Sequence, residues 1–398
     1  MKHKMKNIGL ACLIALIAFQ TRAQEKYHEE GIPTKHITAN PDYALIDSKS
    51  GKYMLVGHVG EGIAKTTTIS VAGQTQQLGP NEKLLNFYGD NFFTYLVGPS
   101  STVLTKYAVN SQIEQTKRAT LDYSLNNISQ SNHGGGVVLF DENEGFGIGY
   151  KIFDKDLRLV KTYIPYEKGY AQGVVGTHEN YTAIASNSLD LSEIKIAIVD
   201  IEGNVSNEFE IQSSQDVKKI YPFNDFFVLY VSGEANVRSV IAIDRTGMVI
   251  WKQPYILPYF HKNIDIKLAN DALYVVTGVA EISILNARSG GLLQTIDLSN
   301  HTEIVKRRTS NSNWGSRISD FQISADGKVI VSMGTLIGKG TDPSKYWYEN
   351  PLTILIDKSN NLIDKIESQG RRKIHFALPR EGGIDLVSEL DKRAYKRN

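Results

Sequence analysis

A strand–turn–strand pattern recurs along the chain from Tyr43 onward with a period of about 45 residues, and this repeat constrains the fold most strongly. Each copy reads as four short strands rich in β-branched and aromatic residues, with Gly, Asn, Asp or Pro at the boundaries. The clearest copy covers residues 218–253. A single four-stranded sheet of this size buries too little apolar surface to be stable alone. We therefore expect the copies to pack against one another.

The turns of the repeat give the number of copies. The turn between the first two strands of a copy, a and b, occurs at Ser50-Gly51, Gly89-Asp90, Gly134-Gly135, Glu179-Asn180, Asn224-Asp225, Asn270-Asp271, Asp326-Gly327 and Glu381-Gly382. The turn between strands c and d occurs at Ala72-Gly73, Asn110-Ser111, Asp154-Lys155, Glu202-Gly203, Thr246-Gly247, Ser289-Gly290 and Asn360-Asn361. Four strands per unit at this period predict an all-β chain folded as a β-propeller. A β-sandwich also has many short strands but does not repeat them so regularly.

The last copy lacks a c–d turn, and this predicts how the ring closes. Residues 373–378, 384–390 and 393–398 can form its strands a, b and c. Residues 34–38, which precede the first full copy, have strand character and can supply strand d, leaving no open gap between the first and last blades. We predict eight four-stranded blades of about 47 residues each. The alternative is seven blades with a stray terminal hairpin.

The first 23 residues have the pattern of a secretory signal peptide. Three lysines precede an apolar run at residues 8–19, and Thr21-Arg22-Ala23 follows with small residues at the two positions that a signal peptidase reads. The run is too short to span a bilayer comfortably, which disfavours an uncleaved anchor. We expect cleavage after Ala23, a single β-propeller domain at residues 24–398, and a periplasmic or secreted protein without membrane insertion.

The cysteine content and the net charge further limit the class of protein and its possible partners. The only cysteine, Cys12, lies inside the signal segment, and Gly9 occupies the position where a lipoprotein would carry Leu. The mature chain then has no disulfide and no thiol nucleophile, so its fold must depend on core packing. A formal net charge of +1 favours neither nucleic acid nor an acidic membrane as partner. We expect a monomer.

Two stretches resemble known repeats. Residues 242–252 (AIDRTGMVIWK) and 284–296 are similar to the c–d hairpins of PQQ-like repeats, which favour the residues found here as Ala242, Asp244, Thr246, Gly247 and Trp251. Residues 323–332 (ISADGKVIVS) resemble the strand pair of WD40-like repeats. The resemblance implies membership of this propeller superfamily without implying one function.

The residues that carry chemistry in other propellers are not found in a recognisable arrangement. Quinone-dependent dehydrogenases of similar repeat need a longer chain, and the nine histidines form no metal-ligand pair at helical or turn spacing. We therefore expect no cofactor and no metal. Residues 141–144 (DENE) have the composition of a calcium site, but a solvated acidic loop is favoured because the ligand spacing is irregular.

The largest irregularity of the repeat lies around blade seven. We predict one inserted loop at residues 301–317, before strand a, and a second at residues 338–351, between strands b and c. In an up-and-down blade the d–a and b–c connections emerge on the same face, so the insertions adjoin. Residues 254–262 lie on this face too. The predicted ligand-binding residues are Trp314, Trp347, Tyr348, Tyr346, Arg307, Arg308, Arg317 and Tyr259.

Two functions remain open at this point. Long loops on a rigid scaffold commonly bind partners, and Trp, Tyr and Arg supply interface anchors, although these side chains can also fold the loops onto the propeller. We favour an exported, non-catalytic binding or scaffold protein whose partner is a protein, peptide or glycan of the cell envelope. The alternative is an exported glycan-processing enzyme, a hydrolase or lyase, with carboxylates such as Asp320 and Asp342 in the central funnel. No catalytic residue is assigned.

Overall fold

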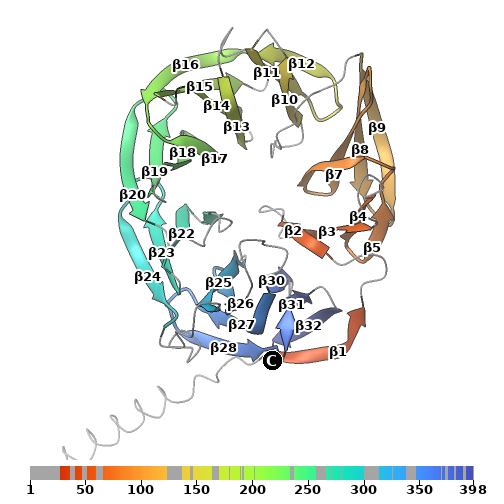
Figure 1. Cartoon of the computed structure of the whole chain (residues 1–398), viewed down its shortest axis with the longest axis vertical. Helices are drawn as coiled ribbons and strands as arrows, with labels where there is room; N and C mark the ends of the chain where they lie inside the picture. The colour runs from red at the N-terminus through yellow and green to blue at the C-terminus, as the bar shows by residue number, and fades with distance from the viewer. Residues whose placement is uncertain are drawn as a thin grey trace, which may run out of the picture.

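The sheets of this protein are arranged in a ring around a central axis, with one strand of each sheet facing the centre and one facing outward (Figure 1). In the described part of the chain all regular structure is β. The computed structural model describes residues 27–35, 41–46, 52–59, 66–122, 137–143, 147–163, 170–178, 180–188, 190, 192–200, 202–233, 237–256, 266–269, 271–278, 280–299, 313–324, 326–337, 347–368, 370–372, 375–380, 382–388 and 391–397.

The described strands form eight antiparallel sheets, and each pairs strands that are consecutive along the chain except where the ring closes and where β29 pairs with β27. The strands of each blade are given from the inner to the outer strand. Blade one has β2 (Pro41–Ile46), β3 (Tyr53–Val59), β4 (Thr66–Val71) and β5 (Gln74–Gln77), blade two has β6 (Lys83–Tyr88), β7 (Asn91–Val97), β8 (Thr102–Val109) and β9 (Ile113–Leu121), blade three has β10 (Val137–Asn143), β11 (Gly147–Phe153) and β12 (Leu159–Tyr163), and blade four has β13 (Tyr170–His178), β14 (Tyr181–Ser188), β15 (Glu193–Asp200) and β16 (Val205–Gln212). Blade five has β17 (Asp216–Pro222), β18 (Phe226–Ser232), β19 (Val237–Asp244) and β20 (Val249–Ile256), blade six has β21 (Lys267–Ala269), β22 (Ala272–Gly278), β23 (Glu281–Asn286) and β24 (Leu292–Asp297), blade seven has β25 (Asn313–Ile323), β26 (Val329–Ile337), β27 (Trp347–Ile356) and β28 (Leu362–Glu367), with β29 (Arg371–Arg372) beside β27, and blade eight has β30 (His375–Arg380), β31 (Gly383–Ser388), β32 (Asp391–Arg397) and β1 (Tyr27–Lys35).

The β-propeller prediction is confirmed, and the eight sheets correspond to the eight a–b turns found in the sequence. Blade three is three-stranded in the described residues, and its predicted turn at Gly134-Gly135 lies outside them.

The hydrophobic core is divided among the interfaces between neighbouring blades. Each of the eight buried clusters is built from two adjacent sheets, and together they run around the whole ring from the first blade to the last and back. The middle strands supply most of these side chains; β14, for example, is buried at every position. Because each blade buries both faces of its sheet against its neighbours, the fold is stable only as a ring.

The c–d turns share one hydrogen-bonding device. The side chains of Asp154, Asp244 and Asp357 each accept the backbone N–H groups of the residues two and four positions later, at 2.8–2.9 Å. The hydroxyl of Thr246 also donates to Asp244 and, with these N–H groups, holds the pKa of that carboxyl below its usual range. This is why the repeat places Asp or Asn at the end of strand c.

Aromatic side chains of one blade dock onto the c–d turn of the next. Gly247 and Gly290 have φ of +98° and +69°, and a Cβ there would lie 2.7 Å from Phe209 and 2.6 Å from Trp251. The indole Nε1 of Trp251 donates to the carbonyl of Ala287 at 3.0 Å. Glycine is therefore required for its backbone conformation and for the close approach of the ring.

The ring closes through the N-terminal strand, as predicted, but the strand lies earlier than residues 34–38. Strand β1 pairs with β32 from Tyr27 opposite Arg397 to Lys35 opposite Asp391. A register shift between Glu30 and Thr34 absorbs the Gly-Ile-Pro segment. Pro33 does not end the strand because an outer strand tolerates a residue without an N–H group, whereas we had placed the strand after it.

A polar network reinforces this closure. Tyr53 of the first blade donates its hydroxyl to Asp385 of the last, and Arg380 bridges Asp385 at 3.2 Å and Glu30 at 2.7 Å. Burial, aided by the Asp385 carboxylate, raises the pKa of Tyr53, so the phenol stays protonated and donates. The backbone N–H of Tyr27 donates to Asp364 of β28 at 2.7 Å, which ties the closing strand to blade seven as well.

Candidate functional site

Blade seven has longer strands than its neighbour. Strands β25 and β27 have 11 and 10 residues, whereas β22 and β23 of blade six have 7 and 6. The additional length lies at the end of the sheet from which the b–c and d–a connections leave. We call residues 313–317, 334–337, 347–350 and 371–372 the blade-seven extension. Four or five strand residues correspond to roughly 15 Å of added sheet.

The strand register brings the two predicted insertions into one sheet. Ile337 of β26 pairs with Asn313 of β25 on one side and with Trp347 of β27 on the other. One strand therefore separates the described ends of the two insertions, residues 313–317 and 347–351, which places these backbone segments about 10 Å apart. Within the described residues, the predicted adjacency is observed in the backbone.

Two strand irregularities separate the extension from the blade. The register shifts between Ile318 and Asp320 of β25 and between Met333 and Thr335 of β26. Pro351 of β27 lies in the second irregularity, where its missing N–H costs no ladder hydrogen bond, and its carbonyl accepts the N–H of Ser368 at 2.9 Å. Such bulges bend a strand and increase its twist.

The extension gains a further strand that the sequence analysis missed. After β28 the chain passes through Gly370, whose φ is +85°, and β29 then pairs with β27. Arg371 lies opposite Glu349, and Arg372 lies opposite Tyr348. The signal available in the sequence was the basic pair that follows Gly370.

The structure corrects the assignment of residues 301–317 and 338–351 as loops throughout. Trp314 and Arg317 lie in β25, and Trp347 and Tyr348 lie in β27. Aromatic residues favour strands, and a partner strand was present for each segment, so they extend the sheet. Four other predicted site residues, Arg307, Arg308, Tyr346 and Tyr259, lie outside the described residues.

Elsewhere on this face the described b–c turns are short and internally bonded. In blade four, Asp190 accepts the hydroxyls of Ser188 and Ser192 at 2.6 and 2.8 Å, and these bonds with the Ser192 N–H lower the pKa of Asp190 to about 2. Asn187 accepts the N–H of Val217 at 3.2 Å and joins the turn to blade five. The polar groups of this turn form hydrogen bonds within the fold, whereas blade seven carries additional sheet at the same end of the ring.

The funnel residues considered for catalysis are only partly within the described chain. Asp320 lies in β25 and accepts the side-chain amide of Gln322 at 2.8 Å, whereas Asp342 is outside the described residues. In the part of the chain that is described, no three His, Cys, Asp or Glu side chains gather closely enough to hold a metal ion. The same residues include no helix long and apolar enough to cross a bilayer.

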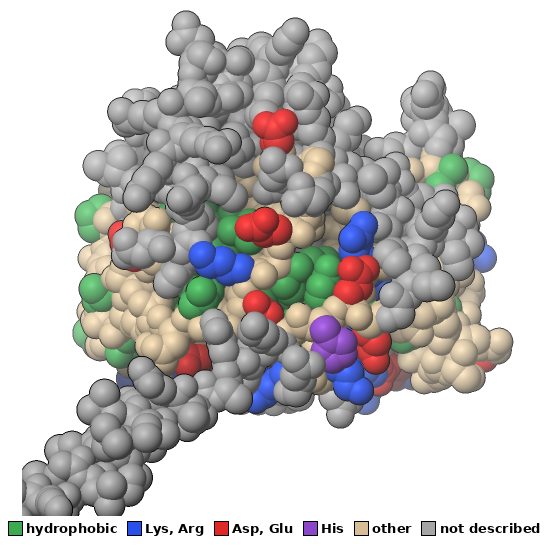
Figure 2. All heavy atoms as spheres, turned by 90° about the horizontal axis from the view of Figure 1, so that it is seen from below, with side chains coloured by type: hydrophobic (Ala, Val, Ile, Leu, Met, Phe, Trp, Pro, Cys, Tyr) green, Lys and Arg blue, Asp and Glu red, His purple; other side chains and the backbone are tan. Residues whose placement is uncertain are grey.

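The flank of the ring that carries blades seven and eight is mixed in charge. Seen from that side, acidic and basic side chains of the described residues are interspersed with apolar areas (Figure 2). Glu29 and Glu30 of β1, for example, face Arg393 and Arg380 at 3.9 and 2.7 Å. The described side chains on this flank form no continuous basic stripe of the kind that contacts phosphate backbones (Figure 2).

Comparison with solved structures identifies the fold. The chain superposes on the Dos1 propeller with a TM-score of 0.51 at 11% identity, covering 93% of this chain and 94% of that one. It superposes on Sqt1 from Chaetomium thermophilum with a TM-score of 0.50 at 9% identity, covering 94% and 100%. The protein has the β-propeller fold.

BamB from Moraxella catarrhalis is similar at a TM-score of 0.45 and 9% identity, with 90% of this chain and 100% of that chain covered. No family model matches the chain, and no curated protein matches it by sequence. At these identities the likeness to the Dos1 propeller and to Sqt1 shows the fold alone, and the function has to be argued from the residues of this chain.

Proposed function

We propose that this protein is an exported, non-catalytic binding or scaffold propeller of the cell envelope, and that the blade-seven extension holds its partner. The observation that carries the proposal is the extension itself, in which four strand segments continue past the end of the ring. Binding surfaces are commonly additions to a rigid scaffold, and this addition stands on a blade whose middle strands are buried in a hydrophobic cluster.

The residue types in the extension fit a protein or peptide partner. Trp314, Trp347 and Tyr348 belong to its strands, and Trp and Tyr are enriched among residues that dominate interface energies. Arg317, Arg371 and Arg372 add donors suited to carboxylates and peptide carbonyls. The outer segment, β29, has only two residues, so an extended peptide can lengthen the sheet at that edge.

Export is supported by the first residues of the sequence. The apolar run at residues 8–19 and the pair Thr21 and Ala23 fit a cleaved signal peptide, and β1 begins at Tyr27, just after the proposed cleavage site. Cleavage after Ala23 would leave the closing strand intact. A propeller without disulfides needs no oxidising compartment to fold, so export and stability are compatible.

Site-specific photocross-linking tests the proposal. A benzophenone amino acid replaces Tyr348 in the exported protein, and a matched variant carries it at Val205, which lies on the outer strand of blade four. We expect one envelope protein to be cross-linked from position 348 and not from position 205. Trp314→Ala and Trp347→Ala should each weaken capture of that protein by about 30-fold, which corresponds to about 2 kcal/mol.

The same variants separate binding from packing. If the thermal midpoint falls sharply while capture by the folded fraction is unchanged, the tryptophans serve the extension's own packing and the proposal is wrong. If no protein is cross-linked but an immobilised glycan is bound in a Trp347-dependent way, the partner is a glycan. If neither class is retained, the blade-seven extension is not the binding surface.

A further inference from the structure

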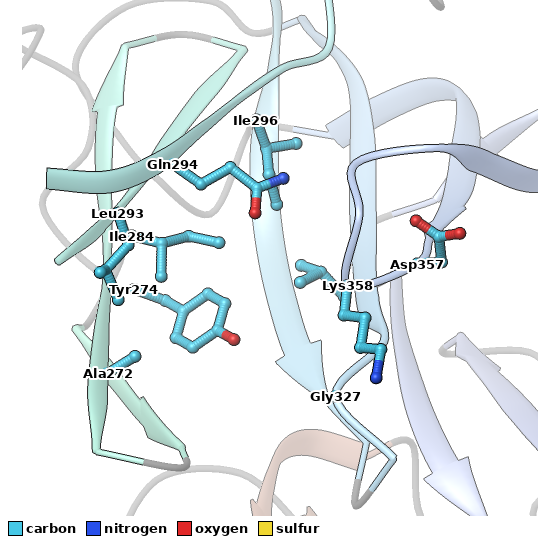
Figure 3. A pocket seen from close by; sticks show the side chains of 10 residues that line it. Ala272, Tyr274, Ile284, Leu293, Gln294, Ile296, Gly327, Asp357 and Lys358 are labelled. Carbon is cyan, nitrogen blue, oxygen red and sulfur yellow. The ribbon is translucent and has the colours of Figure 1, made fainter. Parts of the chain in front are cut away.

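A cleft lies between blades six and seven at the end of the ring opposite the blade-seven extension. It has a volume of about 190 Å³ and lies among Ala272, Tyr274, Ile284, Leu293, Gln294, Ile296, Gly327, Val329, Asp357 and Lys358. The residues come from the sheet of blade six on one side and from the a–b and c–d turns of blade seven on the other (Figure 3). The volume equals that of about six water molecules.

The walls of the cleft are apolar and continue the core between the two blades. Ala272, Ile284 and Ile296 of blade six and Val329 of blade seven are buried members of the same cluster. Leu293 stands at the mouth and is 60% exposed, next to Leu292, which is 62% exposed. An apolar side chain can therefore enter the cleft from the outer rim and pack against these hydrocarbon side chains.

Two polar side chains point into the cleft, and a third lies on its other side. Figure 3 shows the hydroxyl of Tyr274 and the amide of Gln294 directed into the cleft from blade six, and the ammonium of Lys358 beside Gly327 on the other side. Tyr274 is only 7% exposed, and burial raises the pKa of its phenol, which keeps the hydroxyl protonated. Among the described residues, no group forms a hydrogen bond with this hydroxyl.

The hydroxyl of Tyr274 is not among the fully buried polar atoms of the described residues, so it faces the open cleft, where water or a ligand can reach it. The fold itself does not require it here, because the aromatic ring of Tyr274 already packs in the cluster. A phenylalanine would fill the same space, so the packing of the ring does not use the hydroxyl. The hydroxyl is thus suited to an acceptor that comes from outside the chain.

The net charge available in the cleft is positive. Asp357 is directed away from the cleft, and its carboxylate accepts N–H groups of Ser359 and Asn361 within the c–d turn. Lys328 on the neighbouring turn pairs with Asp326 at 2.9 Å, whereas Lys358 forms no ion pair within the described part of the chain. One ammonium and two neutral donors match the acceptors of a single carboxylate, and a dianionic phosphate would call for further cations.

We propose that this cleft binds a carboxylate attached to a short branched apolar group. The apolar group occupies the space between Ile284, Ile296 and Val329, and the carboxylate accepts from Lys358, Tyr274 and Gln294. The same chemistry is presented by a free acyl amino acid and by the C-terminal leucine of a peptide. This site is separate from the blade-seven extension, so the proposal does not depend on the proposed function.

Calorimetric titration of the mature chain tests the proposal with defined probes. The probes are N-acetyl-leucine, its amide, and a hexapeptide of alternating Ser and Gly that ends in Leu, as the free acid and as the amide. We expect each acid to bind at least about tenfold more tightly than its amide. Equal affinity for the two sources indicates a small-carboxylate site, and tighter binding of the peptide indicates a protein C-terminus.

Two variants assign the effect to the cleft. Lys358→Gln should weaken binding of the acids by about tenfold and abolish the preference for acid over amide, and Tyr274→Phe should reduce the same preference. Lys117→Gln, on the outer strand of blade two, is the control and should change nothing. The proposal is overturned if neither acid binds, if acids and amides bind alike to the wild type, or if Lys358→Gln keeps the preference. Since Lys358 is exposed on a turn, its variant remains informative even if Tyr274→Phe does not fold.

Discussion

The contact between Trp251 and Gly290 allows a quantitative test of how neighbouring blades are held together. Replacing Gly290 by Ala places a Cβ 2.6 Å from Cδ2 of Trp251, at a backbone φ of +69°. The left-handed conformation costs an L-residue about 1–2 kcal/mol. Displacing a packed ring adds an overpacking penalty of about 1–3 kcal/mol. We therefore expect Gly290→Ala to lower the free energy of unfolding by about 2–5 kcal/mol.

Gly73 provides a matched control, because its φ is +79° and a Cβ there would meet nothing within 4 Å. Gly73→Ala adds only the strain of a left-handed backbone conformation, so it should lower the free energy of unfolding by about 1–2 kcal/mol. Both variants sit in c–d turns, which keeps the local context similar. The difference between the two costs measures the docking of the ring.

Urea denaturation followed by far-ultraviolet circular dichroism gives the free energies, provided that the slope of the transition is unchanged. In a Trp251→Ala background, Gly290→Ala should cost no more than Gly73→Ala does, because the ring has been removed. If Gly290→Ala and Gly73→Ala cost the same within about 0.5 kcal/mol, or if the Gly290→Ala penalty persists without Trp251, ring docking does not hold the blades together.

Three further predictions concern closure, pH and processing. Deleting residues 24–35 removes β1 and exposes the edge of β32, so the thermal midpoint should fall sharply, and an unchanged midpoint would contradict the closure. The pKa values of Asp200 and Asp244 are lowered by hydrogen bonds from their turns, so their stabilisation is present above the unfolded pKa of about 3.9 and is lost as the pH falls through the folded values. Asp244→Asn keeps the hydrogen-bond acceptor, so it should flatten the acid dependence of the free energy of unfolding measured by urea titration. Asp244→Ala removes the acceptor and should lower stability at pH 7 as well. An acid dependence that is equal in wild type and Asp244→Asn would exclude the turn as its source. Intact-mass analysis of the exported protein should give a chain that begins at Gln24, and a retained Met1 or a lipid on Cys12 would refute the cleavage prediction.

The sequence was sufficient for the architecture because the repeat is encoded by turn chemistry. The residue types of Asp244 and Gly247 predict a c–d turn, because the aspartate supplies the hydrogen-bond acceptor and the glycine adopts the positive φ. The closing strand was predicted in its role but misplaced in its bounds. Its limits depend on pairing with β32, some 360 residues away, and no local signal reveals that an outer strand passes through Pro33.

The candidate site was predicted less completely, for a physical reason. The insertions around blade seven were visible as a change in the repeat spacing, but whether an insertion remains a loop depends on the presence of a partner strand. Trp347 is in a strand because Ile337 lies beside it, and β29 exists because Gly370 turns the chain back along β27. The cleft at Tyr274 was not foreseen at all, since residues of two blades define it and each looks like ordinary core in its own strand.

The two proposed sites can be tested independently because they lie at opposite ends of the same sheet. Strands β26 and β27 run from the turns beside Lys358 and Gly327 to Ile337 and Trp347 in the blade-seven extension. Between them lie the buried residues Val331, Met333, Leu352 and Ile354 of the core cluster. Effects of substitutions that share no contact add, so Lys358→Gln should leave cross-linking at position 348 unchanged and Trp347→Ala should leave the acid-over-amide preference unchanged. A Lys358→Gln variant that lost both properties would show that the packed sheet transmits a change from one end to the other, and each site would then have to be described as part of a coupled pair.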